Sequence, residues 1–176
     1  MKKSLFTFFA AIGFVAAVSA QDGAQTAKGS WLIEANTGFG GEGITAHSAN
    51  TGFSLISTDN STIWGIGAEG GYFVADDLAL KAGLGYSDFD GLTVFSYKVG
   101  AKYYVISAIP FQIDITGASI QDIPENPLWL GLQGGYAFFL SDHISVEPGL
   151  RYNLSLNEDF TDEGIFEFRI GFALYF

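Results

Sequence analysis

The chain has 176 residues, enough for one domain, and its 19 acidic and 8 basic residues give a formal net charge of −11. This acidity makes the chain a poor nucleic-acid binder, because the phosphate backbone repels it. The absence of cysteine excludes disulfides, thiol chemistry and thiolate metal sites.

The first twenty residues have the layout of a secretory signal peptide. A basic start at residues 1–3 precedes an apolar run over 5–18 and a small-residue ending at Ala20. The alternative, a membrane anchor, requires a longer apolar run. We therefore expect cleavage after Ala20 and a short periplasmic tail over 21–28. Removing two lysines with the leader leaves 6 basic and 19 acidic residues, a charge of −13.

Alternating apolar and polar runs recur from residue 29 to the end of the chain. Successive side chains of a β-strand point to opposite faces, so such runs predict strands with two different faces. Most of the runs exceed the ~9–11 residues that a tilted strand needs to cross a bilayer. The eight predicted strands cover 29–39, 62–74, 78–88, 92–105, 110–117, 128–140, 144–156 and 164–176. Residues 52–58 also have strand character but are too short to span, and are expected to form the outer end of the second strand or a flap in the first loop.

The connections between the predicted strands alternate between two ends. Short turns are expected at 75–77, 107–109 and 141–143, and the opposite end carries 40–61, 88–91, 118–127 and 157–163. Outer-membrane barrels have short periplasmic turns and longer extracellular loops. The pattern predicts an all-β fold, an eight-stranded antiparallel up-and-down transmembrane β-barrel over 29–176.

Alternate residues of each predicted strand can be assigned to two faces. The face predicted to point outward carries no charge. It includes Trp31, Ile33, Trp64, Ile66, Leu78, Leu80, Leu84, Phe95, Val99, Ile113, Ile115, Leu130, Leu132, Ile144, Val146, Leu150 and Leu154. Large aromatic residues gather near the strand ends, with Trp31, Tyr72, Tyr103, Phe111, Phe138 and Phe176 toward the periplasm and Phe39, Trp64, Tyr86, Phe95, Tyr152 and Phe166 toward the outside. Two aromatic belts favour a membrane barrel over a soluble lipocalin-like barrel, which buries its apolar face.

The opposite face carries a balanced set of charges. Its members are Glu34, Glu69, Asp114, Glu147 and Glu167 together with Lys81, Lys98, Lys102, Arg151 and Arg169. Charges enclosed by a narrow wall lose hydration and are tolerated only when they are paired. The set therefore predicts a polar network that fills the lumen, with a gated ion or proton path as the alternative.

Candidate catalytic and metal-binding residues are few. His47 lies beside Ser48 in the first outer loop and Asp59 follows, but nothing in the sequence holds these three groups in mutual reach. His143 falls in a predicted periplasmic turn. The acidic residues of the outer loops lack the spacing of a metal cage, although they could bridge through divalent cations to anionic lipid headgroups. We expect no enzymatic activity and no cofactor.

Pro148 is unusual because it lies in the middle of a predicted strand, on the lipid-facing parity. Proline cannot donate a hydrogen bond to a neighbouring strand, and a closed barrel has no free edge to receive it. We expect a bulge at Pro148, with a weak point in the wall, usable for lateral entry, as the alternative.

The last strand alternates without error from Phe166 and ends on the aromatic Phe176. Together with the signal peptide, eight strands, alternating connections and charged interior, this ending resembles the eight-stranded outer-membrane family typified by OmpX and the N-terminal barrel of OmpA. The resemblance covers nearly all of the mature chain. It implies a monomer in the bacterial outer membrane, in contact with its lipid. It also implies delivery by periplasmic chaperones and the barrel assembly machinery, with Tyr175 and Phe176 as the recognition signal; Phe176 fits the lower aromatic belt equally well.

Two functional classes follow from these features. A filled lumen without a catalytic cluster favours a structural or interaction protein whose outer loops, 40–61 and 118–127, contact the exterior. A porin-like barrel for ions or small solutes, or a lipid-modifying enzyme, is the alternative.

The terminal strand generates the first prediction. Replacing Phe176 by a charged residue is expected to impair insertion, because the change alters the proposed assembly signal. The measurement is heat-modifiable gel mobility together with protease protection in cells. A variant that forms a normal, protease-protected barrel would remove the assembly role from this residue.

Overall fold

The computed structural model describes residues 24–39 and 49–176, and the signal peptide predicted over 1–20 lies outside these residues. Its elements are η1 (Ala24–Thr26), β1 (Trp31–Phe39), β2 (Gly52–Ser57), β3 (Thr62–Ala75), β4 (Leu78–Phe89), β5 (Leu92–Val105), β6 (Ile109–Ile120), β7 (Leu128–Gly135), β8 (Phe138–Ser141), β9 (Ile144–Ser155) and β10 (Ile165–Tyr175). No helix within the described ranges is long and apolar enough to cross a membrane.

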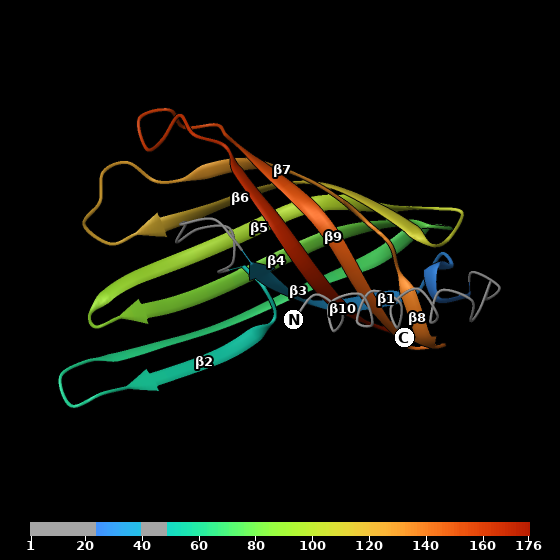
Figure 1. Ribbon diagram of the computed structural model, residues 1–176, viewed down its shortest axis with the longest axis horizontal. Helices are drawn as coiled ribbons and strands as arrows, with labels where there is room; N and C mark the ends of the chain where they lie inside the picture. The colour runs from blue at the N-terminus through green and yellow to red at the C-terminus, as the bar shows by residue number, and fades with distance from the viewer. Residues whose placement is uncertain (1–23, 40–48) are drawn as a thin grey trace, which may run out of the picture.

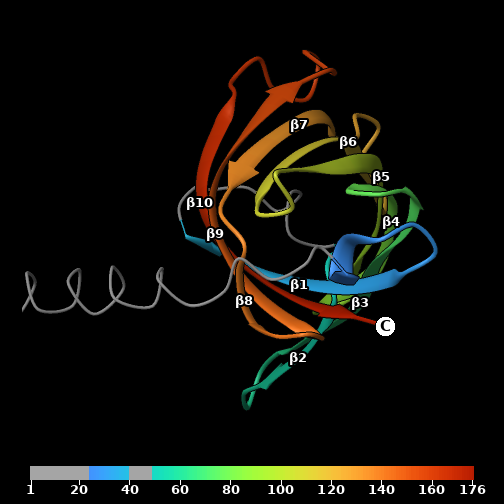
Figure 2. The ribbon, with the colours of Figure 1, turned by 90° about the vertical axis from the view of Figure 1, so that its right-hand side faces the viewer.

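The strands form one antiparallel sheet that closes on itself. Each wall strand pairs with its neighbour in the chain, and β1 pairs with β10 on one side and with β3 on the other. Figure 1 shows the strands running obliquely along the barrel, and Figure 2 shows the ring that they form. With β7 and β8 counted as one wall strand and β2 outside the ring, the predicted eight-stranded barrel is confirmed.

The two faces of the wall agree with the parity of the sequence. Outward side chains such as Ile66 and Val99 are more than half exposed, whereas the inward charged side chains are buried. Apart from Asp88 at the outer tip of β4, the outward strand positions in the described ranges carry no charge. Most of the predicted belt aromatics are exposed on this face, and the side chain of Phe39 lies outside the described part of the structure.

The predicted strand 128–140 is interrupted at Tyr136, and Pro148 of β9 is the cause. The Tyr136 N–H donates to the Pro148 carbonyl (3.1 Å), but proline has no N–H with which to return the bond. The predicted bulge at Pro148 is wrong, because the same number of residues, two, lies between the flanking pairs on both strands, Gly135 with Gly149 and Phe138 with Val146. The wall therefore loses one ladder hydrogen bond here without changing register.

Residues 52–57 form β2, a separate strand in the connection between β1 and β3. Within the described residues it pairs with 62–67 at the outer end of β3 and with no other strand, and both views show it projecting away from the ring (Figures 1 and 2). All six of its residues are exposed. The first outer connection thus carries a β-hairpin arm in addition to the eight wall strands.

Apolar clusters close the two ends of the lumen. At the end predicted to face the periplasm, the rings of Phe73, Tyr104 and Tyr175 pack together with Leu32, with centroid separations of 6.0 and 6.4 Å from Phe73 to the two tyrosines. At the outer end Val94, Ala118 and Ile120 pack together under Phe160, and Trp129 is also buried on the inward face. The charged residues occupy the space between these two layers.

The end of the expected N-terminal tail is packed against the periplasmic turns. Thr26 is buried, and its hydroxyl donates to Asp77 Oδ1 in the turn between β3 and β4 (2.5 Å). The Asp77 N–H donates to the Thr26 carbonyl (2.8 Å), and the Lys28 N–H donates to Asp76 Oδ1 (2.9 Å). Asp77 adopts a positive φ of 63°, a left-handed conformation that Asp tolerates in turns. Thr26 and Lys28 therefore hold this segment against the turn between β3 and β4.

Candidate functional site

The structure places all ten charged residues of the inward face inside the barrel. None of them is more than 3% exposed. Their positions follow from strand parity, because each belongs to a strand whose alternate residues face outward. The antiparallel register then brings residues from distant parts of the chain together, as with Glu167 opposite Arg151.

Lys102 joins two acidic residues near the periplasmic layer. Its Nζ lies 2.5 Å from Glu147 Oε2 and 2.6 Å from Glu34 Oε2. The other oxygen of Glu147 accepts hydrogen bonds from Tyr104 OH (3.0 Å), Ser145 Oγ (2.8 Å) and Tyr175 OH (2.8 Å). Glu147 is thus fully enclosed by donors, and Tyr175 belongs to the interior through its hydroxyl.

Lys81 continues the chain of pairs toward the outer end. Its Nζ lies 2.9 Å from Glu34 Oε2 and 2.7 Å from Glu69 Oε1, the latter a close charge pair that is not aligned as a hydrogen bond. The second Glu69 oxygen accepts a hydrogen bond from Lys98 Nζ (2.8 Å). Three lysines and three glutamates therefore alternate through the lumen.

A second group surrounds Arg151. Its two terminal nitrogens donate to the two oxygens of Asp114, both at 2.6 Å, which is the bidentate geometry favoured by guanidinium. Arg169 pairs with Glu167 at 2.7 Å, and Arg151 Nε lies 3.9 Å from the same Glu167 oxygen. This group contains two acids and two arginines.

Gln112 joins the two groups, and sequence reasoning did not select it. Its Oε1 accepts from Lys81 Nζ (2.8 Å), and its Nε2 donates to Asp114 Oδ2 (2.6 Å). Parity places Gln112 on the inward face two residues before Asp114, so the signal was present. A pattern of charges alone does not identify a neutral amide as part of the network. With Gln112 included, all ten charges form one continuous network.

This arrangement favours a filled lumen over a reaction centre. Each charge has an opposite partner within the wall, and the apolar layers lie above and below. No group of three or more His, Cys, Asp or Glu that could hold a metal ion occurs in residues 24–39 and 49–176. Of the sequence candidates, His47 and Ser48 lie outside these ranges and Asp59 is exposed. His143 sits in a turn with Nδ1 3.0 Å from the Tyr175 carbonyl.

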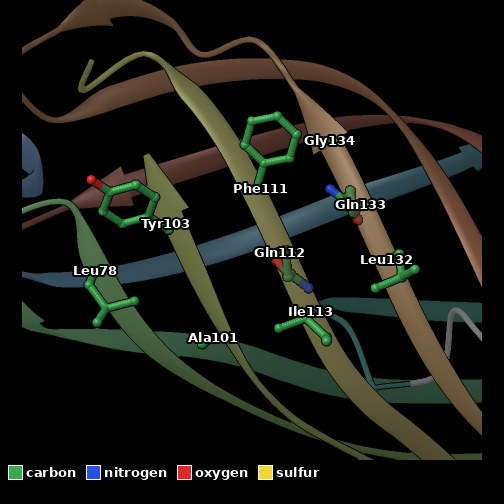
Figure 3. A pocket seen from close by; sticks show the side chains of 9 residues that line it. All are labelled: Leu78, Ala101, Tyr103, Phe111, Gln112, Ile113, Leu132, Gln133 and Gly134. Carbon is green, nitrogen blue, oxygen red and sulfur yellow. The ribbon is translucent and has the colours of Figure 1, made fainter. Parts of the chain in front are cut away.

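A groove of about 570 Å³ opens on the outward face over β4 to β7 (Figure 3). The small residues Ala101 and Gly134 leave room among larger neighbours. Its lining consists of Leu78, Ala101, Tyr103, Phe111, Gln112, Ile113, Leu132, Gln133 and Gly134. No charged side chain lines it, so the groove supplies apolar contact rather than acid-base chemistry.

Several solved structures are similar to this chain, whereas no protein-family model and no curated protein matches it. The N-terminal barrel of Pseudomonas aeruginosa OprF is 15% identical, with 85% of this chain and 98% of that chain covered and a TM-score of 0.49. Neisserial surface protein A is 14% identical, with coverage of 85% and 100% and a TM-score of 0.48. Yersinia pestis Ail is 11% identical, with coverage of 85% and 99% and a TM-score of 0.44. Similarities at this level carry no inference about function.

The network generates a prediction at Lys102. Replacing Lys102 with Met keeps most of the volume but leaves Glu34 and Glu147 without their shared cation. We expect a loss of about 3–5 kcal/mol in the free energy of unfolding, the usual cost of breaking a buried pair. Urea unfolding in lipid vesicles measures it, with Lys28→Met, at an exposed lysine outside the lumen, as the matched control. Equal stability of the two variants would show that the interior charges are not mutually required.

Proposed function

We propose that this chain is a small outer-membrane protein with a closed lumen and a structural or interaction role carried by its extracellular loops. One observation carries the closed lumen: ten charged side chains, each at most 3% exposed, lie between an aromatic layer and a second apolar layer. Permeation through such an interior requires several buried ion pairs to separate together, at a large energetic cost.

The surface of the barrel supports the outer-membrane assignment. A polypeptide in lipid must satisfy every backbone polar group, and closed barrels meet that demand. The outward face is apolar along the strands, with exposed aromatics such as Trp31 and Phe176 near one end and Tyr86 and Phe95 near the other. Outer-membrane barrels combine such aromatic girdles with a polar interior.

The terminal residues support insertion by the assembly machinery, with periplasmic chaperones as transient partners. Phe176 is 64% exposed on the lipid side, and its backbone exchanges hydrogen bonds with Trp31 at 2.7 and 3.0 Å. The last residue therefore both faces lipid and helps to join the first and last strands. A monomer suffices for this role, because the ring closes within one chain.

The outer loops supply the proposed contact surface. The loop after β6 is joined to the loop after β9, because Asn157 Nδ2 donates to the Asn126 carbonyl (2.8 Å). Asn126 Oδ1 in turn accepts from the Ile120 N–H (2.7 Å). These two loops expose the acids Asp122, Glu125, Glu158, Asp159, Asp162 and Glu163. A braced acidic surface favours a partner with basic groups.

Planar lipid bilayers test the closed lumen. The purified, refolded protein is expected to insert without producing discrete, stable conductance steps, because its lumen holds paired side chains. Insertion is verified independently by protease protection in vesicles from the same preparation. Stable unitary currents from verified monomeric barrels would contradict the proposal and favour the porin-like alternative.

Crosslinking in cells tests the interaction role. A photoreactive residue at Ile123 or Leu156 in the outer loops is expected to capture one recurrent partner. The matched control is the same residue at Ile106, which is 78% exposed in the turn between β5 and β6 at the opposite end. Identical capture from both ends, or none from the outer loops, would contradict a specific contact through those loops.

A further inference from the structure

The backbone pairing between β1 and β3 is the shortest contact that closes the ring. It consists of three pairs, Trp31 with Tyr72, Leu32 with Gly71 and Ile33 with Gly70. The pairing of β1 with β10 runs over eight residues, and the other wall strands pair over seven or more. Beyond Gly70, the outer end of β3 pairs with the projecting β2 instead.

Asn50 takes the place of a neighbouring strand along β1. Its Oδ1 accepts from the Asn36 N–H (2.8 Å), and its Nδ2 donates to the Asn36 carbonyl (2.5 Å). A side-chain amide offers the same donor and acceptor as a peptide group. Asn36 therefore keeps a full set of backbone hydrogen bonds after the β1 and β3 ladder has ended.

Thr51 makes the equivalent contact with β3. The Glu69 N–H donates to Thr51 Oγ1 (2.8 Å), and the same hydroxyl donates to the Glu69 carbonyl (3.1 Å). Two consecutive side chains thus satisfy the backbone on both sides of the gap. The preceding Ala49 is fully buried, and its carbonyl packs against Gly83 of β4 so closely that a Cβ there would lie 2.8 Å away.

Glu69 connects this part of the wall to the interior network. Its backbone is held by Thr51, while its carboxylate pairs with Lys81 and Lys98. Separation of the two strands at this point would disturb the buried pairs that Glu69 makes with these two lysines. The interruption at Pro148 differs, because pairing resumes at Phe138 and the Phe139 and Tyr175 rings pack inside it at 5.6 Å.

We propose that Asn50 and Thr51 form a two-residue side-chain clasp that closes the outer half of the wall between β1 and β3, and that the wall opens first at this clasp. An open clasp gives the lumen a lateral path beside Glu69. The inference goes beyond the closed-lumen role, because it identifies which part of the wall moves.

Native-state hydrogen exchange in lipid nanodiscs tests the contacts one by one. Thr51→Val, which removes the hydroxyl and keeps the shape, is expected to speed exchange of the Glu69 amide about tenfold. Asn50→Leu is expected to do the same for the Asn36 amide. Amides in the β9 and β10 ladder should remain as in the unsubstituted protein. Thr58→Val is the matched control, because its hydroxyl bonds Ser61 in the β2 to β3 connection.

A thiol reporter tests whether the wall opens at the clasp. The chain has no cysteine, so Ser96→Cys on β5, fully buried in the lumen, introduces a single thiol. Alkylation by a lipid-soluble maleimide is expected to rise about tenfold or more when Asn50→Leu and Thr51→Val are combined with it. If the triple variant fails to form a barrel, Thr51→Val combined with Ser96→Cys is expected to raise the alkylation rate as well, by a smaller factor. Reporter rates equal to those with Thr58→Val would overturn the clasp as the opening point.

Discussion

Every charged group enclosed by the wall must find an opposite partner inside it, and much of the structure follows from this constraint. Water cannot compensate an isolated ion in a bore closed at both ends. The pairing of Arg151 with Asp114 also explains a glycine, since a Cβ at Gly131 would occupy the space of the Arg151 guanidinium. Gly131 is thus the complement of the long charged side chain of Arg151.

The two ends of the lumen are closed by different means. At the periplasmic end, aromatic rings pack around Phe73, the tyrosine hydroxyls reach Glu147, and the N-terminal segment is bound to Asp77. Several independent contacts therefore hold this end together. At the outer end, one stretch of the wall depends on the side chains of Asn50 and Thr51. A wall opens most readily where few contacts must break at once. We therefore expect greater mobility at the outer end.

The wall strands were predictable because the alternation of apolar and polar residues is a local pattern. The contacts that join different strands depend on distant segments and were not predictable. Alternation from Phe166 onward identifies β10, and parity alone placed the charged residues on the inward face. The contact of Gln112 with Lys81, from a different strand, depends on register between distant segments. The pairing of β2 and the contacts of Asn50 are likewise set by where the β1 and β3 ladder ends, which no local pattern encodes.

The clasp and the projecting hairpin are covalently one unit. Thr51 is followed directly by Gly52, the first residue of β2, and β2 has its hydrogen bonds to β3 on one side only. Displacement of β2 therefore acts on Thr51, whose hydroxyl holds the backbone of Glu69. Because the Glu69 carboxylate pairs with Lys81 and Lys98, Thr51 links the outer hairpin to the interior charges. The filled lumen and the outer surface are thus physically connected at the proposed clasp.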